Sequence, residues 1–203
     1  DNSFALSDLN GFNDPTTTAV VGVGIPVSSK GLVRVAYGPF EARDEGSFSY
    51  DVNFGGASFP AGTELDSSWR YFDLNAFYQH TLLDNRHWGL QGGAGLGAMY
   101  SYATLAAKDG SADALVDDEV FYPYLGLDLE RKFSPKTALV AGGEGFALAD
   151  DWILDLTAEF IWRPIRAWDL ALGYKYFSRK IDTDTFYNKV NYHIPFLSIT
   201  RFW

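Results

Sequence analysis

The sequence predicts an all-β protein: a single antiparallel up-and-down barrel of about ten strands (with eight or twelve as alternatives) that crosses a membrane. Three observations predict it. Side chains alternate between apolar and polar with a period of two over most of the chain. Aromatic residues make up 17% of the 203 residues and 20 are glycines, a composition typical of strands and turns. The connections between alternating segments are short on one side and mostly long on the other, as in outer-membrane barrels.

The alternation gives the strands in chain order. We expect them at residues 3–9 (the weakest), 16–27, 32–43, 69–82, 88–102, 120–132, 137–148, 152–163, 168–176 and 190–203. Counting residues 3–9 makes the number even and puts both chain ends on the short-turn side. Residues 47–54 also alternate, and we place them in the first large loop as a hairpin beyond the membrane.

The connections between these strands are of two kinds. Short ones carry turn-forming residues at 28–31, 84–87, 134–136 and 164–166. Longer polar ones are expected at 44–68, 106–119 and 180–189, with a short exception at 149–151. The sequence therefore predicts short periplasmic turns and long outer loops. No linker interrupts the pattern, so we expect residues 1–203 to form a single domain.

Composition excludes several function classes. The chain has no cysteine and three histidines, which excludes disulfides and thiolate metal sites and leaves little for a histidine-rich one. Its net charge of -10 argues against nucleic-acid binding. Residues 1–4 lack a basic segment followed by an apolar one, so we expect any signal peptide to be already removed. We predict no metal and no cofactor.

Two kinds of side chain indicate which face of each strand meets lipid. Aromatic residues bracket the apolar faces, as at membrane interfaces. The predicted lipid-facing girdle residues are Trp88, Tyr102, Trp152, Trp162, Trp168, Tyr176 and Trp203. The opposite faces carry too many ions for a dry core. The predicted lumen-lining residues are Asp73, Asp128, Glu130, Lys132, Glu144, Asp155, Glu159, Arg163, Asp169, Lys175 and Arg179. The alternative is a soluble sandwich or barrel with its apolar face inside.

The C-terminal segment 195–203, which ends in Phe202 and Trp203, resembles the closing strand of bacterial outer-membrane barrels. Segments 54–68, 123–127 and 172–177 resemble a broad group of uncharacterised proteobacterial outer-membrane barrel proteins. The resemblance implies location in the cell outer membrane, contact with its lipids and lipopolysaccharide, and recognition by the barrel-assembly machinery. It implies no reaction. Arg201 departs from the pattern, because such strands usually carry an apolar residue there.

Several features allow two interpretations. The glycine stripe from Gly89 to Gly97 either leaves open space in the lumen or relieves crowding against bulky neighbours. The acidic loop 108–119 is a solvated surface or recruits divalent cations near lipopolysaccharide. His87 fits a turn residue, and His193 faces outward near a rim.

We therefore expect a monomeric, non-enzymatic barrel with a structural or surface-interaction role, a largely salt-bridged lumen and no catalytic residues. Its interaction surface is expected in the loop 44–68. The alternative is a narrow passive channel for small solutes. A lipid-modifying enzyme is the third hypothesis; it would require a histidine next to a serine or aspartate at a membrane rim.

Overall fold

A computed structural model describes residues 9, 16–148, 151–165, 167–182 and 187–202. In this part of the chain all regular structure is β, and no helix is long and apolar enough to cross a membrane. The strands are β1 Val21–Pro26, β2 Gly31–Gly46, β3 Val52–Phe54, β4 Ala57–Phe59, β5 Leu65–Asp84, β6 Trp88–Ala107, β7 Asp113–Ser134, β8 Thr137–Leu148, β9 Asp151–Ile165, β10 Trp168–Asp182 and β11 Tyr187–Arg201.

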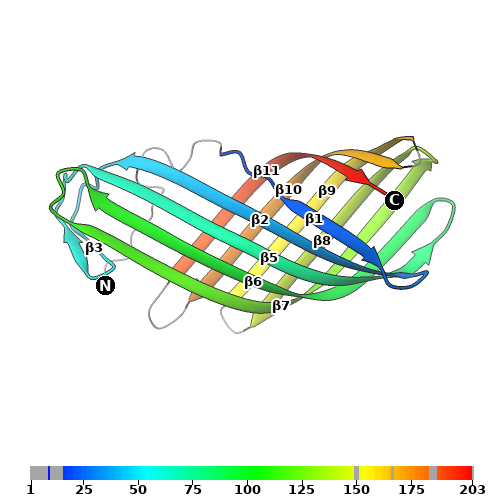
Figure 1. The fold of residues 1–203 in the computed structure, drawn as a ribbon, viewed down its shortest axis with the longest axis horizontal. Coiled ribbons are helices and arrows are strands. Elements are labelled where there is room, and N and C mark those ends of the chain that lie inside the picture. Colours follow the sequence, from blue (N-terminus) through cyan, green and yellow to red (C-terminus); the bar gives the residue numbers. More distant parts are fainter. Residues whose placement is uncertain (1–8, 10–15, 149–150, 166, 183–186, 203) are drawn as a thin grey trace. The chain divides into compact units, whose positions relative to one another are not determined.

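The main sheet has nine strands in the order β1-β2-β5-β6-β7-β8-β9-β10-β11, so each strand pairs with its neighbour in the chain apart from the β3–β4 insertion (Figure 1). This confirms the predicted all-β, up-and-down antiparallel arrangement. The nine strands correspond to nine of the ten expected from the sequence. The tenth, residues 3–9, lies outside the described residues except for Leu9.

Of the three expected long loops, one is shorter than predicted and one is wrong. The connection between β2 and β5 spans residues 47–64 instead of 44–68, and it contains a hairpin at residues 52–59 instead of 47–54. Residues 106–119 hold the end of β6, a turn at 108–112 and the start of β7. The alternation continues through these segments, but the apolar side chains change face. At the third expected loop, residues 180–189, β10 runs to Asp182 and β11 starts at Tyr187. Residues 183–186 lie outside the described residues.

The chain divides into two compact units. Unit 1 comprises Asp1–Val23, Ala36–Asn75 and Gly97–Phe121, and unit 2 comprises Gly24–Val35, Ala76–Leu96 and Tyr122–Trp203. No linker joins them, because the backbones of β1, β2, β5, β6 and β7 run from one unit into the other.

Unit 1 has a small apolar core. The β3–β4 hairpin packs its side chains Val52 and Phe59, 0% and 1% exposed, against Leu65 and Leu105. The other members of the cluster are Leu9, Phe48, Ala107 and Ala114. Four residues after Leu65, Trp69 is 5% exposed, and its ring contacts the Phe40 ring edge-on and the Tyr71 ring at a tilt. Burial of these side chains holds the hairpin on the ends of the long strands.

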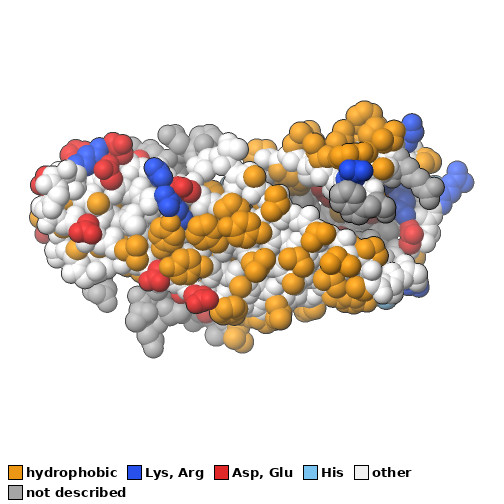
Figure 2. Space-filling model, viewed as in Figure 1, with side chains coloured by type: hydrophobic (Ala, Val, Ile, Leu, Met, Phe, Trp, Pro, Cys, Tyr) orange, Lys and Arg blue, Asp and Glu red, His pale blue; other side chains and the backbone are white. Residues whose placement is uncertain are grey.

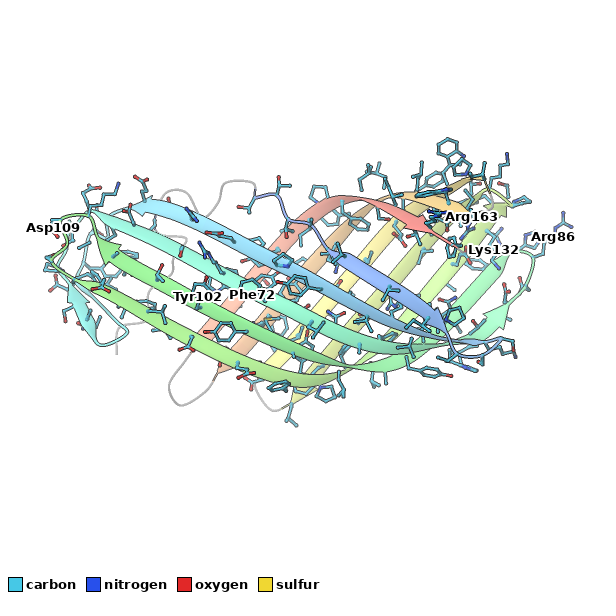
Figure 3. All side chains as sticks on the ribbon, in the orientation of Figure 1. Phe72, Arg86, Tyr102, Asp109, Lys132 and Arg163 are labelled. Atoms are coloured by element: carbon cyan, nitrogen blue, oxygen red, sulfur yellow. The ribbon has the colours of Figure 1, made fainter. Side chains whose placement is uncertain are left out.

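The surface of unit 1 is polar on the face opposite this core. Arg70 forms an ion pair of 2.7 Å with Glu41 and donates a hydrogen bond of 2.8 Å to the Tyr102 hydroxyl. Lys108 pairs with Glu45, and its Nζ lies 3.5 Å from the Asp66 carboxylate. Tyr102 on β6 and Asp109 in the β6–β7 turn, both in unit 1, can be located in Figure 3. Around the β3–β4 hairpin, unit 1 therefore has apolar side chains inside and charged side chains outside, as is usual in water.

Unit 2 has the opposite arrangement. On β9, Leu154, Leu156 and Phe160 are 36%, 45% and 46% exposed, and the alternating residues Asp155, Thr157 and Glu159 are less exposed. The pattern recurs on the neighbouring strands. Exposed members of this apolar face include Leu96, Leu125, Leu127, Leu129, Leu139, Trp162, Leu172, Tyr174, Leu197 and Ile199. Figure 2 shows hydrophobic side chains gathered on the face nearest the viewer, over β5, β6 and β7. We call this set the apolar face of unit 2.

Candidate functional site

The face of unit 2 opposite the apolar face carries charged side chains from neighbouring strands. The registers of β7, β8, β9 and β10 bring them side by side: Glu144 lies opposite both Gly126 and Asp155, and Gly173 lies opposite Glu159. This ionic face consists of Arg34, Asp128, Glu130, Lys132, Glu144, Asp155, Glu159, Arg163, Asp169 and Lys175. Nine of these ten residues are among the eleven expected from the sequence.

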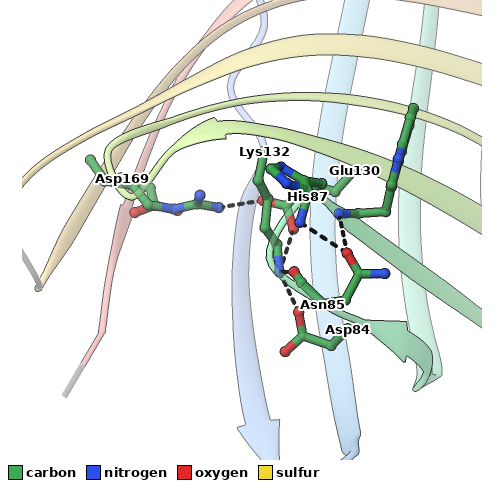
Figure 4. A network of polar contacts seen from close by, with 8 residues as sticks. Asp84, Asn85, His87, Glu130, Lys132 and Asp169 are labelled. Carbon is green, nitrogen blue, oxygen red and sulfur yellow. Dashed lines mark hydrogen bonds and ion pairs between the residues drawn. The ribbon is translucent and has the colours of Figure 1, made fainter.

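An ion-pair ladder crosses one end of this face (Figure 4). The Arg163 guanidinium donates to Glu130 at 2.9 Å and to Asp169 at 3.2 Å. Lys132 pairs with Asp84, donates to the Asn85 carbonyl at 3.3 Å and lies 3.8 Å from Glu130. Each side chain of the ladder except Asp84 is at most 30% exposed. The ladder satisfies ions that are largely removed from water.

Further pairs lie along the same face. Arg34 pairs with Glu144, and its guanidinium lies 5.0 Å from the centroid of the Phe77 ring. Lys175 pairs with Asp155 at 2.6 Å. Asp128 accepts a hydrogen bond of 2.8 Å from the Gln79 amide. The face is therefore extensively paired, which agrees with a salt-bridged interior.

Two carboxylates of the ionic face differ from the rest. Glu159 and Asp128 form no ion pair with any residue that the structure describes. Six carboxylates stand against four cations on the face as defined above, so it carries a negative balance. No group of three or more potential metal-ligating side chains occurs within the described residues.

The remaining two residues of the predicted set lie elsewhere. Asp73 is in unit 1, where it accepts a hydrogen bond of 2.9 Å from Asn75. Arg179 is on the same face of β10 as Asp169 and Lys175, but it is only 1% exposed and lies buried toward the other end of the strand. The sequence pattern does not predict Arg34 or Gln79, which contact Glu144 and Asp128 on the ionic face. A cation inside the apolar run of residues 32–37 was the available signal for Arg34.

The glycine stripe is occupied by bulky side chains. A Cβ on Gly93 would lie 2.8 Å from the Phe77 ring, and one on Gly95 would lie 2.6 Å from the Tyr124 ring. A Cβ on Gly89 would lie 2.9 Å from the Glu130 carboxylate. Of the two interpretations of the stripe, the structure favours relief of crowding over open space at these three positions.

Four of the predicted girdle residues lie near strand ends. Trp88, Trp162 and Trp168 are at the short-turn ends of β6, β9 and β10, and Trp152 is at the opposite end of β9. Tyr176 lies in the middle of β10. Tyr102 belongs to the charged surface of unit 1, where Arg70 contacts its ring. Trp203 lies outside the described residues.

The histidines show no catalytic arrangement among the described residues. Nδ1 of His193 bonds to the Tyr174 hydroxyl, and the ring also contacts Tyr176. Nδ1 of His80 lies 3.2 Å from the Tyr78 hydroxyl. His87 is a turn residue: its backbone N–H donates to the Asn85 side chain at 2.9 Å and its carbonyl accepts from Lys132.

In comparisons with known proteins, no family model, no curated protein and no solved structure matches this chain.

Proposed function

We propose that the chain is an integral barrel of a bacterial outer membrane, monomeric and non-enzymatic, with a structural or surface-interaction role. The observation that carries the proposal is the two-sided character of unit 2. Its exposed leucines and aromatic residues form a continuous surface over adjacent strands, while ions pair on the opposite face. Soluble monomers rarely expose apolar patches of more than a few hundred square ångströms. A surface of this kind is suited to contact with the hydrocarbon interior of a membrane.

The length of the apolar stretches supports the proposal. On β7 the exposed face is apolar from Phe121 to Leu129 and again at Phe133, whereas Asp117 and Glu119 precede it on the same face. A tilted transmembrane strand needs about 9–11 residues. The apolar part of β7 meets this length, and the rest of the strand suits water.

Unit 1 supports a role at the cell surface. An apolar cluster is enclosed beneath the β3–β4 hairpin, and charged pairs such as Arg70–Glu41 lie on the surface of the unit. Tyr50, just before the β3–β4 hairpin, is 40% exposed, and it offers an aromatic contact within residues 44–68. We propose this segment as the interaction surface. Outer-membrane lipids and lipopolysaccharide would surround the barrel, and the C-terminal strand would be read by the assembly machinery.

Two exposed leucines on one face of β7 provide the test. Leu115 in unit 1 is 56% exposed and Leu127 in unit 2 is 53% exposed. If Leu127 faces hydrocarbon, Leu127→Arg should destabilise the protein by about 2–4 kcal/mol, whereas Leu115→Arg should change stability by less than about 0.5 kcal/mol. Urea titration of the protein refolded into lipid vesicles measures both.

Cell fractionation and gel migration complete this test. The wild type should be recovered with the outer membrane, and unboiled samples should migrate differently from boiled ones on a detergent gel. A protein in the soluble fraction, with migration unaffected by boiling and with equal effects of the two arginines, would contradict the proposal.

The second candidate is a narrow passive channel. The observation in its favour is the negative balance of the ionic face, with Glu159 and Asp128 outside the ion pairs described above. An open passage lined this way would favour cations. Conductance in planar bilayers tests it: discrete steps whose cation selectivity falls in Glu159→Ala or Asp155→Ala support a channel. The absence of steps from wild-type protein that has inserted supports the closed barrel.

A further inference from the structure

Two arginines of unit 2 lie over tryptophan rings at the short-turn ends of the strands. The Arg131 guanidinium is 4.6 Å from the centroid of the Trp88 ring, and that of Arg201 is 5.6 Å from the Trp168 ring. The pairing of the strands fixes both contacts. Trp168 lies directly opposite Arg201 in the β10–β11 register, and the backbone N–H of Lys132 donates to the His87 carbonyl, which brings β7 beside the start of β6.

The geometry leaves the hydrogen-bonding edge of Arg131 available. Stacking on a ring uses the flat face of a guanidinium, whereas its N–H donors lie in the plane and point outward. Lys132, the next residue, is directed to the other face and pairs with Asp84. Arg131 forms no ion pair with any described residue. A planar fork of donors of this kind matches the oxygens of a phosphate group.

The surroundings of the two arginines are apolar. Leu129 and Phe133 flank Arg131 on its own face of β7, at 44% and 60% exposure, and Leu139 lies opposite Arg131 on β8 at 43%. Ile199, two residues before Arg201, is 64% exposed. Each site therefore combines a cationic group with adjoining apolar surface, which suits a molecule that has a phosphate headgroup and acyl chains.

We propose that the Arg131–Trp88 and Arg201–Trp168 pairs bind the phosphate headgroups of anionic glycerophospholipids. These lipids would belong to the leaflet on the short-turn side, with their acyl chains along Leu129, Leu139 and Ile199. The inference rests on the proposed membrane insertion and adds a lipid class and a leaflet to it. Charge complementarity favours this end of unit 2, because its turns also carry Lys30, Arg86 and Lys136.

The test compares two spin-labelled lipids at the surface of the refolded protein. Wild-type protein in phosphatidylcholine vesicles should associate with labelled phosphatidylglycerol more strongly than with labelled phosphatidylcholine. Arg131→Ala and Arg201→Ala should each lower that preference about fivefold, the effect of about one cation near a charged lipid. Arg131→Lys and Arg201→Lys should retain more of the lipid preference than the alanine variants do, because lysine keeps the charge but lacks the planar guanidinium.

Two control variants separate a built site from general attraction. Lys136→Ala removes a cation from a short turn, and Arg43→Ala removes one from the surface of unit 1. Arg43→Ala should leave the lipid preference unchanged, and Lys136→Ala should lower it less than Arg131→Ala does. Equal losses in Lys136→Ala and Arg131→Ala would overturn the proposal, because diffuse charge would then explain the binding. Displacement of the labelled lipid by inorganic phosphate would overturn the assignment to a lipid headgroup.

The same measurements separate lipid-headgroup binding from membrane insertion. Protein that enters the vesicles and shows no preference between the two lipids overturns this inference and leaves the outer-membrane proposal intact. Wild-type protein that fails to enter vesicles overturns both. Trp88→Leu with Trp168→Leu should weaken the preference while both charges remain, an effect that charge alone does not produce.

Discussion

At the scale of single residues, Arg163 has the central place in the ion-pair ladder. It joins Glu130 on β7 to Asp169 on β10, and its side chain is 30% exposed. Removing it leaves two neighbouring carboxylates without their shared cation. We expect Arg163→Ala to lower the free energy of unfolding by about 1–3 kcal/mol, measured by urea titration with tryptophan fluorescence.

The matched control for Arg163 is Arg43, which pairs with Glu41 but has a side chain 69% exposed. Exposed ion pairs contribute about 0–1 kcal/mol. Arg43→Ala should therefore be close to neutral. Losses of the same size in both variants would show that the ladder has no special role in stability.

Asp109, in the β6–β7 turn of unit 1, gives a prediction for pH. Its carboxylate accepts hydrogen bonds from the Ser111 side chain and from the Ser111 backbone N–H, the latter at 2.9 Å, and these lower the pKa of Asp109. Because the folded-state pKa is lowered, the turn is stabilised above the ordinary aspartate pKa of about 3.9. That stabilisation is lost as the pH falls through the lowered pKa of Asp109.

Ser111→Ala should raise the pKa of Asp109 toward its ordinary value, because the hydroxyl donor is lost while the backbone donor remains. NMR titration of the Asp109 carboxyl carbon measures the midpoint. An unchanged Asp109 midpoint would mean that the serine hydroxyl does not act on the carboxylate.

At the scale of elements, the β3–β4 hairpin depends on its two-residue turn. Gly55 and Gly56 have φ angles of +57° and +81°, and the flanking residues Phe54 and Ala57 pair directly. Two consecutive residues with positive φ form the turn that suits strand twist in a hairpin. A side chain at either position costs about 1–2 kcal/mol of backbone strain.

The two glycines differ in their surroundings, which separates strain from crowding. A Cβ at Gly56 meets nothing within 4 Å, whereas one at Gly55 lies 3.0 Å from the Ala114 Cβ and 3.2 Å from the Leu115 carbonyl. Gly55→Ala should therefore destabilise the hairpin more than Gly56→Ala. Hydrogen exchange of the β3 and β4 amides measures the difference, and equal protection in the two variants would contradict it.

Several long strands extend beyond the ends that the sequence predicts for them. Along β7 one face carries Ala114, Val116 and Val120 in unit 1, and Asp128, Glu130 and Lys132 in unit 2. The period of two is continuous, but the apolar residues change face. One consistently apolar face ends at this change, so the sequence pattern predicts a loop for the residues beyond it. The strand backbone continues because hydrogen bonding to neighbouring strands does not depend on which face is apolar.

At the scale of the whole molecule, charge is distributed unevenly between the two units. The described residues of unit 1 include twelve carboxylates and three cationic side chains, whereas those of unit 2 include nine and twelve. The overall charge of -10 conceals this difference. The acidic surface of unit 1 is suited to contact with water. In unit 2 the charges form ion pairs on one face of the sheet, and the opposite face is apolar.

The sequence by itself determined the strand content, the strand order, most of the short turns and nine of the ten residues on the ionic face. It could do so because side chains alternate strictly in a strand, so residue parity assigns each residue to a face. Only the tertiary structure decided which ions pair, that Phe77 and Tyr124 cover the glycine stripe, and that Asp73 lies in unit 1. It alone also revealed the contacts of Arg34 with Glu144 and of Arg131 with Trp88. Such contacts depend on the register between strands and on side-chain rotamers, which parity within one strand does not specify.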